Sequence, residues 1–378
     1  MIHPSALFDS LKAHGIEFFA GVPDSLLKFF CAYVTDQVDE SRHVIAANEG
    51  SALALSAGHY LGTGRPGLVY LQNSGLGNAI NPLLSLNDPE VYGIPVLLMI
   101  GWRGEPGVAD EPQHIKQGRI TISLLDTMEI PWQIIDSNTV DIDAVVSVAM
   151  NQMQARGGPA AFLVRKDTFT PCSLGGGDNI GLPLSREQAI RRIVTHSGAS
   201  ARVVVTTGMA ARELYEFRAS RGEGGGTDFL TVGSMGHAAS IALGLAQSQP
   251  NRRIICLDGD GSVLMHMGAV AIVGQSRQEN LIHVVLNNGA HDSVGGQPTV
   301  GFSIDIAGIA RSCGYREVRV AETERAIDVA LPELFRRSGP SLLEVRVKKG
   351  ARADLGRPRS SPAENREALM NGLGVTRR

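Results

Sequence analysis

The feature that most constrains the fold is a segment in which two apolar strands flank a turn and a helix. Residues 254–257 (IICL) enter a Gly-Asp-Gly turn centred on Asp260, a helical segment follows, and residues 282–286 (IHVVL) end at Asn287 and Asn288. In open α/β sheets, ligands bind at the carboxyl ends of the strands. The turn and the asparagine pair both stand at such ends, so we expect a binding site there.

The side chains of this segment suit a metal-bridged diphosphate. Asp260 offers a hard carboxylate oxygen and an asparagine offers a neutral amide oxygen, which Mg²⁺ prefers when phosphate oxygens complete its octahedron. Glycines beside Asp260 let backbone N–H groups approach a phosphate, and the helix N-terminus beyond favours an anion. An ordinary turn rich in glycine and asparagine is the alternative, but the spacing of the turn and the asparagine pair favours a metal and diphosphate site.

Apolar and helical segments alternate along both halves of the chain, which predicts parallel sheets with helices on both faces. We predict an α/β protein of two doubly wound parallel-sheet domains, 1–168 and 187–378, joined by a linker at 169–186 whose Gly, Pro and polar residues lack this pattern. An Arg/Pro-rich tail from Ala351 is expected to be loosely held in its final part. The expected strands lie near residues 16–21, 43–47, 66–72, 94–101, 132–136, 159–165, 202–208, 228–232, 253–259, 281–288, 316–322 and 341–347.

Composition limits the functional classes. The net charge of −3 and a pI near 6.4 provide no basic surface for nucleic acid. No apolar run reaches the roughly 18 residues that predict a membrane span, and no charged-then-apolar leader precedes the first helical pattern. The four cysteines form neither a CxxC pair nor a dense disulfide scaffold. We expect a cytoplasmic protein with reduced cysteines and no membrane or nucleic-acid partner.

The Gly-Asp-Gly turn and the asparagine pair resemble the thiamine diphosphate motif of a superfamily of decarboxylases and carboligases. In that superfamily the aspartate, the second asparagine and a backbone carbonyl two residues later bind the metal. These positions match Asp260, Asn288 and Ala290. The resemblance implies thiamine diphosphate and Mg²⁺ as cofactors, with Gly261 and Ser262 among the cofactor-binding residues.

Two further segments match the superfamily. Glu49, where a strand meets a helix, matches the carboxyl group that bonds N1′ of the aminopyrimidine and activates the cofactor; the alternative is an acid that stabilises a helix N-terminus. In residues 232–246, the resemblance implies that the carbonyl of Gly233 accepts the 4′-amino group and that Met235 supports the bent cofactor, with Ser234 between them. An ordinary core residue is the alternative for Met235.

The matching positions divide between the two predicted domains, with Glu49 in the first and the metal motif in the second. In the superfamily the two halves of a site come from different subunits, so the resemblance implies at least a homodimer with active sites between subunits. Most relatives carry a third, central domain. The predicted linker is too short to hold one.

Long segments resemble the branch of the superfamily that acts on 2-keto acids bearing a phosphonate. They are residues 21–28 (GVPDSLLK), 70–107, 110–121 (DEPQHIKQGRIT) and 287–299 (NNGAHDSVGGQPT). The implied reaction converts 3-phosphonopyruvate into phosphonoacetaldehyde and CO2 through a thiamine ylide and an enamine, in phosphonate and antibiotic biosynthesis. The sulfonate-processing relatives are the main alternative, and an acetolactate-type carboligase is a further one.

A phosphonate pocket calls for cationic donors. Arg103, His114, Lys116 and Arg119 gather in a segment that we interpret as a long loop between a strand and a helix. We expect Arg103, His114 and Lys116 to contact the substrate. A solvated loop whose charges pair with its own acidic residues is the alternative.

Four more polar residues are candidates for substrate contact or proton transfer. Asp24 and Ser25 stand where related decarboxylases keep a substrate-facing polar residue, although aspartate is also a preferred cap for a helix beginning at Ser25 or the next residue. His291 and Asp292 follow the metal motif and are candidates to relay a proton. The residue that protonates the intermediate stays unassigned, because the adjacent histidines and the glutamate of pyruvate decarboxylases have no match here.

Overall fold

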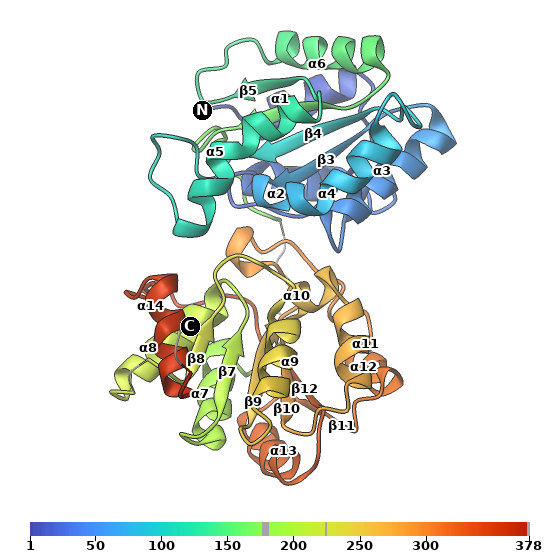
Figure 1. The fold of residues 1–378 in the computed structure, drawn as a ribbon. Helices are drawn as coiled ribbons and strands as arrows, with labels where there is room; N and C mark the ends of the chain where they lie inside the picture. The colour runs from blue at the N-terminus through green and yellow to red at the C-terminus, as the bar shows by residue number, and fades with distance from the viewer. Residues whose placement is uncertain (176–180, 224, 376–378) are drawn as a thin grey trace. The chain divides into compact units, whose positions relative to one another are not determined.

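The computed structural model describes residues 1–175, 181–223 and 225–375, and the chain divides into two compact units, Met1–Gly177 and Asp178–Arg378 (Figure 1). Part of the predicted linker, residues 176–180, lies outside the described residues, so its boundaries at 169–186 stay a prediction. Within the described residues, no helix is both long enough and apolar enough to cross a membrane.

The first unit is a six-stranded parallel sheet in the order β2-β1-β3-β4-β6-β5, flanked by helices (Figure 1). Its strands are β1 (Phe19–Gly21), β2 (His43–Ile45), β3 (Gly67–Gln72), β4 (Val96–Gly101), β5 (Trp132–Ile135) and β6 (Ala160–Val164). Its helices are α1 (Pro4–Ala13), α2 (Lys28–Gln37), α3 (Glu49–Thr63), α4 (Leu76–Pro82), α5 (Pro112–Thr127) and α6 (Ile142–Arg156).

The second unit is also a six-stranded parallel sheet, in the order β11-β12-β10-β9-β7-β8. Its strands are β7 (Arg202–Val205), β8 (Asp228–Leu230), β9 (Ile254–Gly259), β10 (Leu281–Asn287), β11 (Glu317–Ala321) and β12 (Ser341–Arg346). Its helices are α7 (Arg186–Ser197), α8 (Met209–Ser220), α9 (Ala238–Ser248), α10 (Asp260–Met265), α11 (Gly268–Gln275), α12 (Ile306–Cys313), α13 (Glu324–Arg336) and α14 (Pro362–Gly372).

The two sheets share one topology. When the strands of each unit are numbered along the chain, both sheets have the order 2-1-3-4-6-5. The prediction of two doubly wound domains is therefore confirmed, and each predicted apolar run contains a strand. Such strands are apolar on both sides because helices cover both faces of the sheet. In β3, Leu68 and Tyr70 join one core cluster, whereas Val69 and Leu71 join the cluster on the opposite face.

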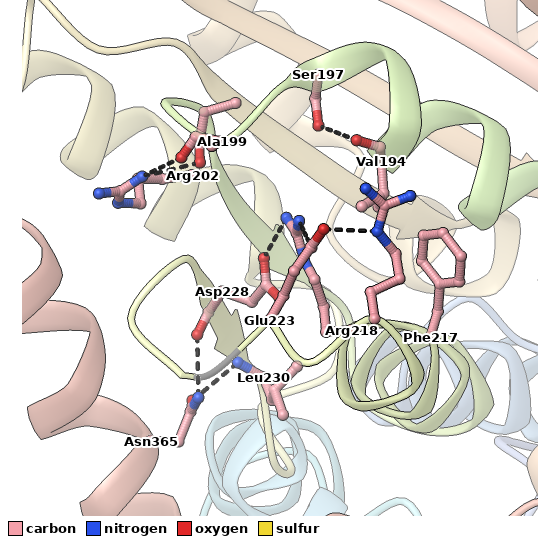
Figure 2. Close-up of polar contacts among 12 residues, drawn as sticks. Val194, Ser197, Ala199, Arg202, Phe217, Arg218, Glu223, Asp228, Leu230 and Asn365 are labelled. Carbon is pink, nitrogen blue, oxygen red and sulfur yellow. Dashed lines mark hydrogen bonds and ion pairs between the residues drawn. The ribbon is translucent and has the colours of Figure 1, made fainter.

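The tail after Ala351 is more ordered than we expected. It ends in helix α14, whose first turn carries a capping box between Ser361 and Glu364. The amide side chain of Asn365 accepts a hydrogen bond from the N–H of Leu230 and donates one to the carbonyl of Asp228, both at 3.0 Å (Figure 2). The expectation of a loosely held tail is wrong for these residues, because α14 satisfies backbone groups of β8.

The position of α14 matters because β8 is the last strand in its sheet and has a free edge. Free edges expose unpaired backbone groups and are commonly covered by a helix or loop. The Asp228 carboxylate is in turn held by Arg218 (Figure 2), with N···O distances of 3.0 and 3.1 Å. Strand β8 leads directly into the loop that contains Gly233 and Met235, so α14 and Arg218 fix the start of that loop.

Candidate active site

The Gly-Asp-Gly turn lies at the carboxyl end of β9, and helix α10 begins at Asp260. The Asp260 carboxylate is 2% exposed and accepts hydrogen bonds from the Thr299 hydroxyl and, at 3.4 Å, from the N–H of Asn288. Burial raises its pKa from 3.8 to about 6, although these hydrogen bonds act in the opposite direction. A buried carboxylate with a raised pKa and no cation beside it is suited to gain a metal ion.

The two asparagines at the end of β10 have different surroundings. The Asn287 amide donates to the carbonyl of Gly301 and to the Glu344 carboxylate, at 2.8 and 2.9 Å, so its side chain braces the core. The Asn288 amide nitrogen donates to Asp292 at 2.7 Å, and its oxygen accepts the N–H of Ala290 at 3.1 Å. The Asn288 oxygen therefore lies in the loop after β10, beside Ala290.

The loop after β8 reaches the same turn. Gly233, Ser234 and Gly236 have φ values of 69°, 46° and 86°, in the left-handed region that glycine adopts without strain. The Ser262 hydroxyl of α10 accepts the N–H of Gly236 at 3.0 Å. The predicted cofactor residue Ser262 thus holds the loop against the helix.

Gly261 has no room for a side chain. A carbon added at its Cβ position would lie 2.9 Å from the His291 imidazole and 3.4 Å from the methyl carbon of Met235. The structure therefore brings together the turn, the loop of Met235 and the segment after Asn288. These are the three elements in which the sequence placed its candidates of the second domain.

His291 and Asp292 differ in their surroundings and in their capacity for further interactions. Burial lowers the pKa of His291 to about 4, so its ring is neutral at pH 7. The Asp292 carboxylate is already occupied by an ion pair with Arg186 at 2.8 Å and by the Asn288 amide. Asp292 consequently acts on the position of Asn288, a role that the sequence did not predict.

In the first unit, Glu49 is the first residue of α3 and is 5% exposed. The Asn48 side chain caps the helix by accepting the N–H of Ser51 at 2.9 Å, and the Asn78 amide donates to Glu49 at 2.8 Å. Burial raises the pKa of Glu49, and the Asn78 hydrogen bond partly offsets this rise. Any side chain on Gly75 would collide with the Glu49 carboxylate, so the acid is tightly enclosed.

Asp24 lies shortly after β1 and is completely buried. Its carboxylate accepts the Gln72 amide at 2.5 Å and the N–H of Leu26 at 2.9 Å, and burial raises its pKa. The expected helix start at Ser25 or Leu26 is wrong, because these residues form a turn and α2 begins only at Lys28. Asp24 caps that turn.

Arg103 follows β4 and is held on two sides. Its guanidinium makes a two-point ion pair with Asp110, with Nε at 2.8 Å, and donates to the Ser25 hydroxyl at 2.7 Å. The alternative of pairing with a loop acid is correct for Arg103, but its side chain is only 17% exposed and not solvated. Three of its five N–H donors have partners among residues 1–175, 181–223 and 225–375, which leaves two.

The other three cations of the segment do not lie in a loop. His114, Lys116 and Arg119 belong to α5, which begins at Pro112, so the predicted long loop is wrong beyond residue 111. Proline at the first helical position favours this earlier start. His114 is buried and its Nδ1 has no hydrogen-bond partner among the described residues, whereas Lys116 and Arg119 are exposed. Burial and the nearby Arg103 lower the pKa of His114 to about 4.

Comparison with known proteins places these features in a family. The thiamine pyrophosphate enzyme N-terminal TPP binding domain matches residues 4–128, and the C-terminal TPP binding domain matches residues 206–345. A phosphonopyruvate decarboxylase of Streptomyces viridochromogenes is 36% identical, covering 96% of this chain and 93% of that protein. The chain belongs to the thiamine pyrophosphate enzyme family.

Two further relatives are similar to this chain over most of its length. A phosphonopyruvate decarboxylase of Streptomyces hygroscopicus is 34% identical over 96% of this chain and 92% of that protein. A sulfopyruvate decarboxylase of Methanosarcina acetivorans is 27% identical over 91% of each chain.

The residues of this thiamine pyrophosphate enzyme fit its cofactor. A buried carboxylate at Asp260 and the Asn288 amide oxygen are of the donor types that Mg²⁺ prefers, and Gly261 leaves its backbone open where a Cβ would collide. The predicted cofactors, thiamine diphosphate with Mg²⁺, are confirmed by the two matching domains.

Proposed function

We propose that this enzyme decarboxylates 3-phosphonopyruvate to phosphonoacetaldehyde and CO2. The observation that carries this proposal is similarity along nearly the whole chain, at 36% and 34% identity, to two phosphonopyruvate decarboxylases. The sulfopyruvate decarboxylase is less similar, at 27%. Sulfopyruvate is therefore the alternative substrate.

Thiamine diphosphate, when bound, supplies the electron sink for the carbon–carbon bond that breaks as CO2 leaves. We assign Asp260, Asn288 and the carbonyl of Ala290 to the metal. Ser234, Gly261 and Ser262 shape the diphosphate site, while Gly233 and Met235 contact the rest of the cofactor. These roles rest on the matched motif and on the contacts of the turn described above.

We assign Glu49 the proton that it shares with N1′ of the aminopyrimidine. Its raised pKa supports this role, because a carboxyl group that resists ionisation can hold a proton against a ring nitrogen. Asp24 is the second buried acid of the first unit with a raised pKa. We assign it to proton handling at the substrate, and we assign His291 to the same task from the second unit.

The phosphonate is assigned to three basic residues of the first unit, Arg103, His114 and Lys116. Arg103 has two free N–H donors beside the Ser25 hydroxyl, and the His114 Nδ1 is buried without a partner. Lys116, exposed on α5, adds charge at longer range. Guanidinium groups match the oxygens of such anions in geometry and charge.

We further propose a cytoplasmic homo-oligomer, at least a dimer, in which Glu49 of one subunit serves the metal motif of another. Purified Glu49→Gln and Asp260→Ala variants, dissociated and reassociated as a mixture, should then recover about a quarter of the wild-type activity, since half of the dimers are mixed and each has one intact site. No recovery in verified mixed oligomers would mean that both groups serve a site from the same subunit.

The substrate is tested by CO2 release from phosphonopyruvate, sulfopyruvate and pyruvate, with thiamine diphosphate and Mg²⁺ present or omitted. The expected result is cofactor-dependent release with a preference for phosphonopyruvate, and Arg103→Gln raising KM for it more than it lowers kcat. Arg119→Gln, which removes an exposed charge from the same segment, is the control. A preference for sulfopyruvate would replace the assigned substrate, and release from pyruvate alone would exclude both.

A further inference from the structure

A polar pocket lies in the second unit, at the other end of the sheet from Asp260. It has a volume of about 450 Å³ and is lined by residues from 250–253, 277–280 and 335–338. These segments come directly before β9, β10 and β12, which are neighbours in the sheet. Strands of six or seven residues rise about 3.3 Å per residue, so the pocket is roughly 20 Å from the Gly-Asp-Gly turn.

The charge of this pocket is unbalanced. Four arginines line it and only one acid, Glu279, does so. Glu279 pairs with Arg316 at 3.3 Å, and one of the four, Arg337, pairs with Glu317 at 2.7 Å. Among the described residues, the other three have no carboxylate partner; they are Arg253, Arg277 and Arg336.

Arg253 is the most constrained of these three cations. Its Nη2 donates to the carbonyl of Phe335 at 2.8 Å, and its guanidinium lies over the Phe335 ring at 5.3 Å. Its Nη1 is buried and, within the part of the chain that the structure describes, has no hydrogen-bond partner. A buried donor without an acceptor is costly, and an oxyanion in the pocket would supply the missing acceptor.

Arg277 lines the pocket and has an unfavourable backbone conformation. Its φ of 54° lies in the left-handed region, where glycine fits without strain and other residues are uncommon. An arginine at this position is a poor choice for the turn alone. It does provide a second cation for the pocket.

The pocket walls are held in place by backbone contacts. The Asn280 amide nitrogen lies within hydrogen-bond distance of three carbonyl oxygens, those of Ala246 in α9 and of Gln249 and Arg252 after it, at 2.7–3.1 Å. The N–H of Gly339 donates to the carbonyl of Glu279 at 2.8 Å. These contacts join the three lining segments, so the backbone that carries the cations is fixed before any ligand arrives.

We propose that this pocket is an anion-binding site, separate from the cofactor motif, for a small molecule that carries a phosphate or phosphonate group. Three guanidinium groups without carboxylate partners match a dianion with three acceptor oxygens. Strands β9 and β10 connect this pocket to the turn of Asp260 and to Asn288. The inference uses only the second unit and does not rest on the proposed substrate.

The test is calorimetric titration of the enzyme loaded with thiamine diphosphate and Mg²⁺, which keeps the titrant out of the cofactor's own site. Inorganic phosphate and methylphosphonate are titrated separately, in chloride buffer at constant ionic strength. The expected result is saturable binding that persists in Arg103→Gln, which disables the proposed substrate site of the first unit. The tighter of the two anions identifies the source, free phosphate or an organic phosphonate.

The decisive variant is Arg277→Gly, because it removes a cation and relieves the backbone at once. Its affinity for the anion should fall roughly tenfold, as expected for a lost charge-assisted hydrogen bond, while its thermal unfolding temperature stays unchanged or rises. Arg253→Gln should weaken binding similarly. Arg325→Gln, at an exposed position on α13, is the charge-matched control and should leave binding unchanged.

Three results would overturn the proposal. They are the absence of saturable binding by either anion, an unchanged affinity in folded Arg277→Gly, and an equal loss in Arg325→Gln. The last would indicate general attraction to a cationic surface.

Discussion

Glu49 in the first unit and Asp260 in the second are both buried acids at the first residue of a helix, yet their partners differ. Glu49 has one side-chain donor, the Asn78 amide. Asp260 accepts the Thr299 hydroxyl and the N–H of Asn288 from two separate segments. Burial raises the pKa of each acid.

The comparison teaches that one physical perturbation can serve two tasks. A raised pKa favours a carboxyl group that shares a proton, as proposed for Glu49. The same desolvation leaves the ionised form of Asp260 short of positive charge, which a metal ion supplies. The partners separate the two roles, because Glu49 has a single neutral amide as its donor, whereas two donors partly offset the effect of burial on Asp260 and favour its charged form.

The largest effect is expected at Glu49. Glu49→Gln keeps the shape of the side chain but removes the acid, so turnover should fall by about 10²–10⁴-fold, the range for a lost acid–base group. Thiamine diphosphate binding, followed by calorimetry, should persist. Glu90→Gln, at an exposed position, is the control, and near-normal turnover in Glu49→Gln would end the proposed proton role.

Asp260→Ala should fail in a different way. Losing a metal ligand should weaken thiamine diphosphate binding in Mg²⁺ by more than about a hundredfold, since losing even an outer-shell partner costs 10–100-fold. Titration of the cofactor into the metal-loaded variant measures this effect. If Asp260→Ala bound the cofactor normally and only turned over slowly, the proposed difference between a metal ligand at Asp260 and a proton-sharing acid at Glu49 would be wrong.

The pH dependence of the metal-free protein sharpens the contrast further. The pKa of Asp260 is about 6 in the folded chain against an ordinary 3.8, so the folded state binds this proton more tightly. The contribution of Asp260 to the free energy of unfolding is greatest below pH 3.8 and declines as the pH rises through 6. Above pH 6, the raised pKa makes the folded state about 3 kcal/mol less stable than it would be with an unperturbed pKa. Asp260→Asn cannot ionise and should avoid this loss.

Urea unfolding of metal-free wild type and Asp260→Asn checks this expectation. The variant's advantage in unfolding free energy should grow between about pH 4 and pH 7. Mg²⁺ with thiamine diphosphate should stabilise the wild type far more than the variant. An advantage that did not change with pH would mean that Asp260 is not the titrating group.

The smallest effect is expected from the partner of Glu49. The Asn78 hydrogen bond lowers the pKa of Glu49, so Asn78→Ala should raise it. The alkaline limb of the kcat/KM profile, where Glu49 loses its proton, should then move to higher pH by about one unit or less, as expected for one hydrogen bond. Asn81→Ala, at an exposed position on the same helix, should leave the limb in place.

Much of this molecule could be predicted from its sequence because the signals are local. Each strand is an apolar run, and the turn of Asp260 and the pair at Asn288 have a fixed spacing within one strand–helix–strand unit. Glu49 could be proposed because it stands where a strand gives way to a helix. The roles of these residues stay predictions until the variants above are measured.

The partners of the site residues could not be predicted, because they come from packing between distant segments. Asn78 lies 29 residues after Glu49, and Arg186 lies 106 residues before Asp292. Nothing in the local pattern around either partner marks it. The start of α5 carried a local signal, the proline at its first position, which outweighed the loop-like composition before it.

The order in which this protein folds follows from how strand β8 is covered. Asn365 reaches the backbone of β8 across 135–137 residues of chain. During synthesis β8 is made long before α14, and closing so large a loop is slow compared with local pairing. The second sheet therefore passes through a stage with an open edge, at which partly made chains are most prone to pair with one another.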